Sequence, residues 1–156
     1  MSVLGPIHRT VTVASPPERA FAVFTTGMAT WWPLETHSIA VDQELGQRAT
    51  DLLVEPRVGG LVEEVLEDGS RRRWAEILVW EPPLRVAYAW KPNDLPTPPT
   101  RLQVRFIGRD DGTTVEIEHR GWDGLGSYGE RLRPLYDAES GWTMVLARYQ
   151  EAAAGP

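Results

Sequence analysis

The sequence predicts an α+β domain in which a strongly curved antiparallel sheet surrounds one long C-terminal helix. Short β-branched and aromatic runs follow one another with only tight turns between them, which is typical of a meander and therefore of an antiparallel sheet. These runs alternate apolar with polar residues, so one face of the sheet is buried. The only long amphipathic segment available to cover that face lies at the C-terminus.

The first elements are marked by local signals. Residues 7–14 are rich in β-branched side chains and predict a strand, and Ser15-Pro16-Pro17-Glu18 predicts its end and the start of a helix with Ser15 as N-cap. We expect this helix over residues 17–24. Residues 28–33 then predict a short second helical turn that is closed by Pro33.

The remaining strands are separated by glycine, proline and acidic turns. We expect them at residues 52–55, 61–66, 72–80, 84–91, 101–108 and 113–122, with a proline-rich loop at 92–99. In the last strand Val115, Ile117 and His119 alternate with Glu116 and Glu118, so the first three are predicted to point inward. The outward glutamates are expected to form ion pairs with Arg105 and Arg120.

The C-terminal helix is predicted from residues at i, i+3, i+4 and i+7, namely Trp142, Val145, Leu146 and Tyr149. Leu132, Leu135 and Ala138 extend a similar stripe, although Pro134 is expected to start or kink a helix. A single helix does not fill a curved sheet of five to seven strands, so the sequence also predicts a cavity.

Composition restricts the function. The chain has 156 residues, 42% of them apolar, which fits a single domain over 1–156 with its own core. The net charge of −6 makes nucleic acid an unexpected partner, and the absence of cysteine excludes thiol chemistry, thiolate metal sites and disulfides. Neither a signal peptide nor an apolar run of about 20 residues is present, so we expect a cytoplasmic protein without a membrane span.

Several motifs resemble a known family in their order and spacing over about residues 7–153. They are Ser15–Phe21, Trp31-Trp32, Val58-Gly59-Gly60, Glu81–Val86, Gly112-Thr113-Thr114, His119–Trp122 and Gly141-Trp142. In these the chain resembles the START-like or SRPBCC superfamily with its helix-grip fold, and within it the branch of activator of ninety-kilodalton heat-shock protein ATPase homologues. The resemblance implies two short helices after the first strand and a cavity for apolar or aromatic small molecules.

The same superfamily includes lipid and hormone carriers, polyketide cyclases and aromatases, and an activator of a chaperone ATPase. The chain lacks the separate N-terminal domain of that activator, so a chaperone partner is not favoured. The leading hypothesis is non-catalytic binding of a small hydrophobic or aromatic ligand in the cavity. A cyclase, dehydratase or hydrolase that uses His119 is one alternative, and an interaction module, either a homodimer or a chaperone partner, is another.

The predicted ligand-binding residues are mostly aromatic, with plain core packing as the alternative for each. They are Trp31, Trp32, Tyr88, Trp90, Phe106, His119 and Trp142. His119 is the one titratable member, placed for a general acid or base, for a ligand anchor, or for a structural hydrogen bond to backbone or a tyrosine. Because no second catalytic group is identifiable, it remains a weak candidate and no catalytic residue is assigned.

The remaining motifs give little information about function. Gly124–Gly129 spells GxGxxG, but no parallel strand follows, so a dinucleotide site is rejected, and Ser127 with Glu130 is interpreted as a capping box. The three histidines are far apart, so neither a metal nor a cofactor is expected. Of Glu63 and Glu64, one faces inward and one outward, while Glu76 is ambiguous. Solvated glutamates are the commoner case, but a buried one would merit a catalytic role.

Overall fold

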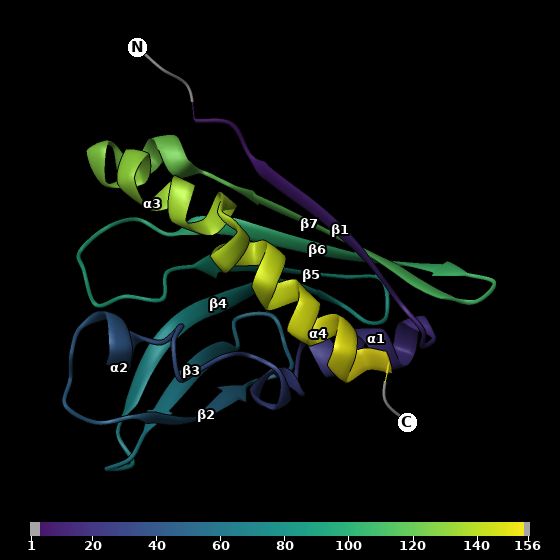
Figure 1. Ribbon diagram of the computed structural model, residues 1–156, viewed down its shortest axis with the longest axis horizontal. Helices are drawn as coiled ribbons and strands as arrows, with labels where there is room; N and C mark the ends of the chain where they lie inside the picture. Colours follow the sequence, from purple (N-terminus) through teal and green to yellow (C-terminus); the bar gives the residue numbers. More distant parts are fainter. Residues whose placement is uncertain (1–3, 155–156) are drawn as a thin grey trace.

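The computed structural model describes residues 4–154 and contains the predicted curved antiparallel sheet and C-terminal helix. Seven strands pair in the order β1-β7-β6-β5-β4-β3-β2. Figure 1 shows the sheet curling around the helical C-terminal segment, which crosses its concave side diagonally. The strands are β1 (Ile7–Val13), β2 (Ala49–Val54), β3 (Leu61–Leu66), β4 (Arg71–Glu81), β5 (Arg85–Trp90), β6 (Thr100–Arg109) and β7 (Gly112–Arg120).

Helices lie in two parts of the chain, between β1 and β2 and after β7. The predicted pair after the first strand is present as α1 (Pro17–Phe24) and η1 (Met28–Thr30). A further short helix, α2, precedes β2 and was not predicted. After β7 the chain forms η2, α3, a π-helical turn η3 and α4. The bounds of these five elements are Ile39–Asp42, Trp122–Leu125, Ser127–Asp137, Glu139–Thr143 and Met144–Ala154.

The strand alternation is confirmed by burial. Val115, Ile117 and His119 are buried, and in the β6–β7 register Ile117 lies opposite Val104. The expected ion pairs are found only in part. Glu118 contacts Arg120 at 3.5 Å within the same strand, whereas Glu116 and Arg105, although opposite in register, form no ion pair within the described residues. Side chains this exposed lose rotamer entropy when they pair, which offsets much of the attraction.

Both predicted helix caps are wrong. Pro16 is the N-cap of α1 and makes no side-chain hydrogen bond, while the Ser15 hydroxyl is buried with no partner among residues 4–154. The Ser15 carbonyl instead accepts a hydrogen bond from Thr113 Oγ1 at 2.7 Å, so tertiary contacts fix this corner. At α3 the N-cap is Gly126, and no Ser127–Glu130 capping box forms.

The C-terminal helix is broken in the middle. Ala138 is extended and Gly141 adopts a non-helical backbone, so α3 and α4 point in different directions. A Cβ on Gly141 would collide with the carbonyl oxygens of Leu135 and Tyr136, which explains why glycine is present there. The predicted stripe is buried, with Val145, Leu146 and Tyr149 on α4 and Trp142 in η3. Of its extension, Leu132 is partly buried and Leu135 is 65% exposed.

Candidate functional site

A cavity of about 690 Å³ lies between the sheet, α3, the α3–α4 break and the segment around α2. Its wall is formed by residues from five separate parts of the chain. They are Trp32, Thr36, His37, Ser38, Asp42, Gln43, Trp74, Pro92, Asn93, Asp94, Leu95, Tyr128, Leu132, Leu135, Tyr136, Ser140, Gly141, Trp142 and Val145. The broken helix contributes most of one side, so the backbone at Gly141 directly shapes the cavity.

Three tryptophans form the inner wall. The Trp32 ring lies 5.0 Å from the Trp74 ring and 6.0 Å from the Trp142 ring between centroids. Each indole N–H is already used: Trp32 donates to the His37 carbonyl at 2.7 Å, Trp74 to Glu64 Oε1 at 2.8 Å, and Trp142 to His119 Nδ1 at 3.0 Å. The wall therefore has no unsatisfied indole donor, and Trp32, 8% exposed, offers the cavity most of the indole surface, since Trp74 and Trp142 are each 1% exposed and pack around it.

Glu64 supports this wall from behind. Its side chain is fully buried, and its two oxygens accept from the N–H groups of Ile39 at 2.8 Å and Ala40 at 2.9 Å as well as from Trp74. Glu64 thus joins the start of α2 to the Trp74 indole. Of the ambiguous glutamates it is the inward one, because Glu63 is partly exposed beside Arg71 and Glu76 is exposed. Because three donors satisfy the Glu64 carboxyl group, its burial is explained by a structural role.

The mouth of the cavity is polar. His37 Nε2 lies 2.8 Å from the Ser140 carbonyl, and since a carbonyl only accepts, this nitrogen carries a proton. His37 Nδ1 lies 2.7 Å from Thr36 Oγ1. The His37–Ser140 hydrogen bond therefore connects the segment before α2 with the α3–α4 break across the cavity.

Two carboxylates, those of Asp42 and Asp94, lie at this mouth and differ in their hydrogen bonds and ion pairs. Asp94 pairs with Arg72 at 2.7 Å and, with the Gln43 amide oriented to suit its neighbours, exchanges two hydrogen bonds of 3.0 Å with Gln43. The Asp42 carboxylate has neither a hydrogen bond nor an ion pair among residues 4–154. Burial on one side raises the pKa of the Asp42 carboxyl above its usual value, with His37 opposing this and Glu64 adding to it.

The predicted site residues are only partly brought together. Trp32 and Trp142 line the cavity, and Trp90 borders a small adjoining void of about 10 Å³. Trp31, Tyr88 and Phe106 lie elsewhere in the core. Trp31 donates to the Val23 carbonyl at 2.7 Å, which fixes it against α1. The cavity wall thus differs from the expected lining: Phe106 packs against Phe21 and Phe24 of α1, and Tyr88 packs against Trp90.

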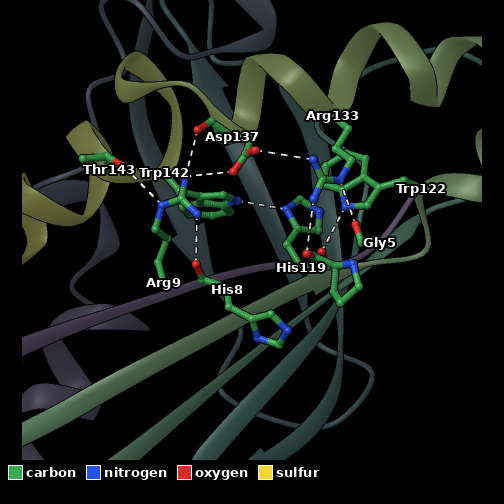
Figure 2. Close-up of polar contacts among 10 residues, drawn as sticks. Gly5, His8, Arg9, His119, Trp122, Arg133, Asp137, Trp142 and Thr143 are labelled. Carbon is green, nitrogen blue, oxygen red and sulfur yellow. Dashed lines mark hydrogen bonds and ion pairs between the residues drawn. The ribbon is translucent and has the colours of Figure 1, made fainter. Parts of the chain in front are cut away.

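His119 does not line the cavity. It lies fully buried behind Trp142, whose N–H it accepts, and Figure 2 shows its ring between Trp142 and Trp122. Its Nδ1 is an acceptor, so its Nε2 carries the proton and donates to Thr100 Oγ1 at 2.7 Å. Burial lowers the pKa of the imidazole to about 3. The arrangement matches the structural alternative, although the partners are a tryptophan and a threonine.

An ionic cluster links the end of α3 to β1 (Figure 2). Arg9 on β1 donates to Asp137 Oδ1 and to the Asp137 carbonyl, both at 2.8 Å, and to Thr143 Oγ1 at 3.2 Å. Arg133 contacts Asp137 Oδ2 at 3.4 Å and donates to the Gly5 carbonyl at 2.7 Å. These bonds hold the end of α3 against β1. They therefore also fix the position of α3, which forms part of the cavity wall.

Sequence reasoning missed the cavity residues of the α2 segment and of α3. For α3 a signal existed, since Tyr128, Leu132 and Tyr136 recur every four residues and all three line the cavity. For His37 and Asp42 no local pattern was available, because α2 is held by the distant Glu64.

The curved sheet around a C-terminal helix, together with an internal cavity, defines a helix-grip domain of the START-like superfamily. Residues 14–154 match the family model described as Activator of Hsp90 ATPase homolog 1-like protein, so the chain belongs to this family, as its motifs predicted. No curated protein matches the sequence.

Solved structures share the fold over nearly the whole chain. An anthrahydroquino-γ-pyrone synthase, Txn09, is 29% identical with a TM-score of 0.64, covering 95% of this chain and 96% of its own. CalC, a self-sacrificing resistance protein from Micromonospora echinospora, is 21% identical with a TM-score of 0.65 and coverages of 96% and 94%. The Aha1 dimer from Colwellia psychrerythraea is 15% identical with a TM-score of 0.66 and covers 97% of each chain.

Two further findings concern residues 4–154. None of their helices is both long and apolar enough to cross a bilayer. Within the same residues, no three histidine, cysteine or acidic side chains come together as a group able to hold a metal ion.

Proposed function

We propose that the chain binds a small apolar or aromatic molecule in the cavity lined by Trp32, Trp74 and Trp142. The observation that carries the proposal is the cavity itself: three tryptophans border a space of about 690 Å³, Trp32 with the largest exposed fraction, and their N–H groups are all hydrogen-bonded within the protein. A pocket of this size with aromatic walls and a few polar groups at its mouth is typical of small-molecule sites.

The driving force is sufficient for such a ligand. An aromatic group that buries roughly 200 Å² of apolar surface gains about 5 kcal/mol from desolvation. Association costs at least about 4 kcal/mol, so simple aromatic fragments bind weakly and multi-ring molecules bind better. We therefore expect affinity to rise with the number of fused rings until the cavity is full.

Tryptophan fluorescence with anthracene-methanol as a neutral probe tests the proposal. Saturable quenching is expected for the native protein. The blocking variant Leu132→Trp places a large ring in the cavity wall and should weaken binding at least tenfold, whereas Glu130→Trp, on the exposed side of the same helix, should leave it unchanged. Absence of saturable binding by the native protein would refute the proposal, and so would equal affinities of both variants with the native protein.

A second candidate function is catalysis in the same cavity. It is favoured by the 29% identity to a protein named as a synthase. His119 does not line the cavity, whose titratable lining residues are His37, Asp42, Asp94, Tyr128 and Tyr136. Of the two carboxylates, Asp94 pairs with Arg72, whereas Asp42 has neither a hydrogen bond nor an ion pair among the described residues. A hydroxyanthraquinone with a β-diketone side chain is a suitable test substrate, because ring closure to a pyrone releases one water that mass spectrometry detects. Unchanged substrate after prolonged incubation would contradict this function.

The interaction hypotheses stay predictions. The Aha1 likeness shows the fold and does not carry its dimer over to this chain. Gel filtration with light scattering measures the oligomeric state directly, and a mass corresponding to one chain would contradict the homodimer.

A further inference from the structure

The charges around the cavity are unevenly distributed. The wall contains the carboxylates of Asp42 and Asp94 but, among residues 4–154, neither a lysine nor an arginine. Three cationic side chains lie near the wall without belonging to it. Arg72 pairs with Asp94, and Arg131 lies with its guanidinium 6.0 Å from the ring centroid of Tyr128. Lys91, which borders the small adjoining void, donates to the Asn93 carbonyl at 3.3 Å. An anionic ligand would therefore enter without a counter-charge from the wall.

Only Asp42 is available to a ligand. Asp94 is neutralised by Arg72 and held by Gln43, whereas the Asp42 carboxylate has no protein partner among the described residues. Asp42 is exposed on α2 and lies close enough to Tyr128 for its charge to add to the burial that raises the pKa of that phenol. The charges of His37 and of the buried Glu64 act on Asp42 with opposite signs. Asp42 is consequently a carboxylate at the cavity wall that has no hydrogen bond or ion pair among the described residues and lies beside an aromatic wall.

This combination suits one class of ligand. A cationic amine gains from a carboxylate at the mouth and from the negative faces of aromatic rings below it. The rings that border the cavity are those of Trp32, which is 8% exposed, and Tyr136, which is partly buried. Both pack on the buried Trp142, with centroids 6.0 Å away for Trp32 and 5.8 Å away for Tyr136. A carboxylate-bearing ligand of the same shape meets repulsion from Asp42 instead.

We infer that the cavity selects an aromatic molecule that carries a cationic amino group, with Asp42 at the mouth as its counter-ion. The inference rests on the proposed function and specifies its ligand class. The ring system lies against the indole wall, and the ammonium group points toward α2. The ammonium group would also pair with the one wall carboxylate that has no partner among residues 4–154.

Three probes with one ring system separate the charge effect from ring binding: anthracene-methylamine, anthracene-methanol and anthracene-carboxylate. Their dissociation constants are measured by fluorescence titration of the native protein at neutral pH and low salt. We expect the amine to bind about tenfold more tightly than the alcohol, and the carboxylate to bind most weakly. Salt should reduce the preference for the amine but not the affinity for the alcohol.

Two variants with equal net charge locate the effect. Asp42→Asn should bring the amine to the affinity of the alcohol and leave the alcohol unaffected. Glu44→Gln removes the same charge from an exposed residue two positions away, outside the cavity wall, and should retain the preference. Equal binding of all three probes, tightest binding of the carboxylate, or an unchanged preference in Asp42→Asn would overturn the inference while leaving the proposed function intact. If no probe binds, the proposed function fails as well.

Discussion

Replacement of Glu64 by glutamine is the sharpest test of how the cavity wall is held. The change keeps size and shape, but the amide has one acceptor oxygen where the carboxyl group has two, and its NH₂ faces a backbone or indole donor. Three hydrogen bonds converge on Glu64, from Ile39, Ala40 and Trp74 at 2.8, 2.9 and 2.8 Å. At least one of these donors is left buried and unpaired in the variant.

The magnitude follows from burial. Hydrogen bonds to a charged acceptor contribute about 1.5–3 kcal/mol each, and an unpaired buried donor costs about 1–3 kcal/mol. We therefore expect Glu64→Gln to lower the free energy of unfolding by about 2–4 kcal/mol in urea titrations. The cost is that high because the Glu64 side chain is 0% exposed.

Glu63→Gln is the matched control on the same strand. Glu63 faces outward and contacts Arg71 at 3.5 Å, with the arginine side chain 56% exposed. Such pairs contribute about 0–1 kcal/mol, so the control should lose less than about 1 kcal/mol. Equal losses in the two variants would refute the role assigned to Glu64.

The remaining predictions concern the helix break and its surroundings. Because burial lowers the pKa of His119 to about 3 from an ordinary 6.5, its contribution to stability is complete above pH 6.5 and is lost progressively as the pH falls toward 3. His119→Gln should flatten the pH dependence of urea unfolding in that window, and an unchanged slope would contradict the assignment. Gly141→Ala should cost more than about 2 kcal/mol, because the added Cβ collides with two carbonyl oxygens; a melting temperature equal to the native one would show that the break relaxes freely. Arg9→Lys should lose about 1 kcal/mol, because lysine does not reproduce the forked contact with Asp137, and Arg57→Lys, at an exposed pair, serves as its control.

Much of the sheet was predictable because its signals are local. Alternation in β7 placed Val115, Ile117 and His119 on the buried face, and short turns between strands implied antiparallel pairing. The C-terminal stripe was equally clear from its helical spacing, and Val145 and Tyr149 on α4 are buried together with Trp142 in the preceding turn η3. Alternation gives the face of a residue but not its neighbours, so it did not separate the cavity wall from the remaining core.

The parts that could not be predicted depend on distant contacts. Helix α2 has only four residues and its first N–H groups bond to Glu64, which lies 24 to 25 positions away. The helix break requires a close approach of the chain around Gly141 and an ionic contact from Arg9 to Asp137, 128 positions apart. These contacts place His37 and Asp42 at the cavity. No sequence pattern within the segment that contains these two residues predicts this position.

In the proposed complex the ligand lies against the wall formed by Trp32, Trp74 and Trp142. Their indole N–H groups give separate NMR signals, assigned by single tryptophan substitutions, and report contact at each ring. On titration with anthracene-methanol we predict saturable shifts of these three signals with one dissociation constant, and none for Trp31 or Trp122. Shifts confined to Trp31 and Trp122, or no saturable shift at the three wall signals, would contradict this arrangement.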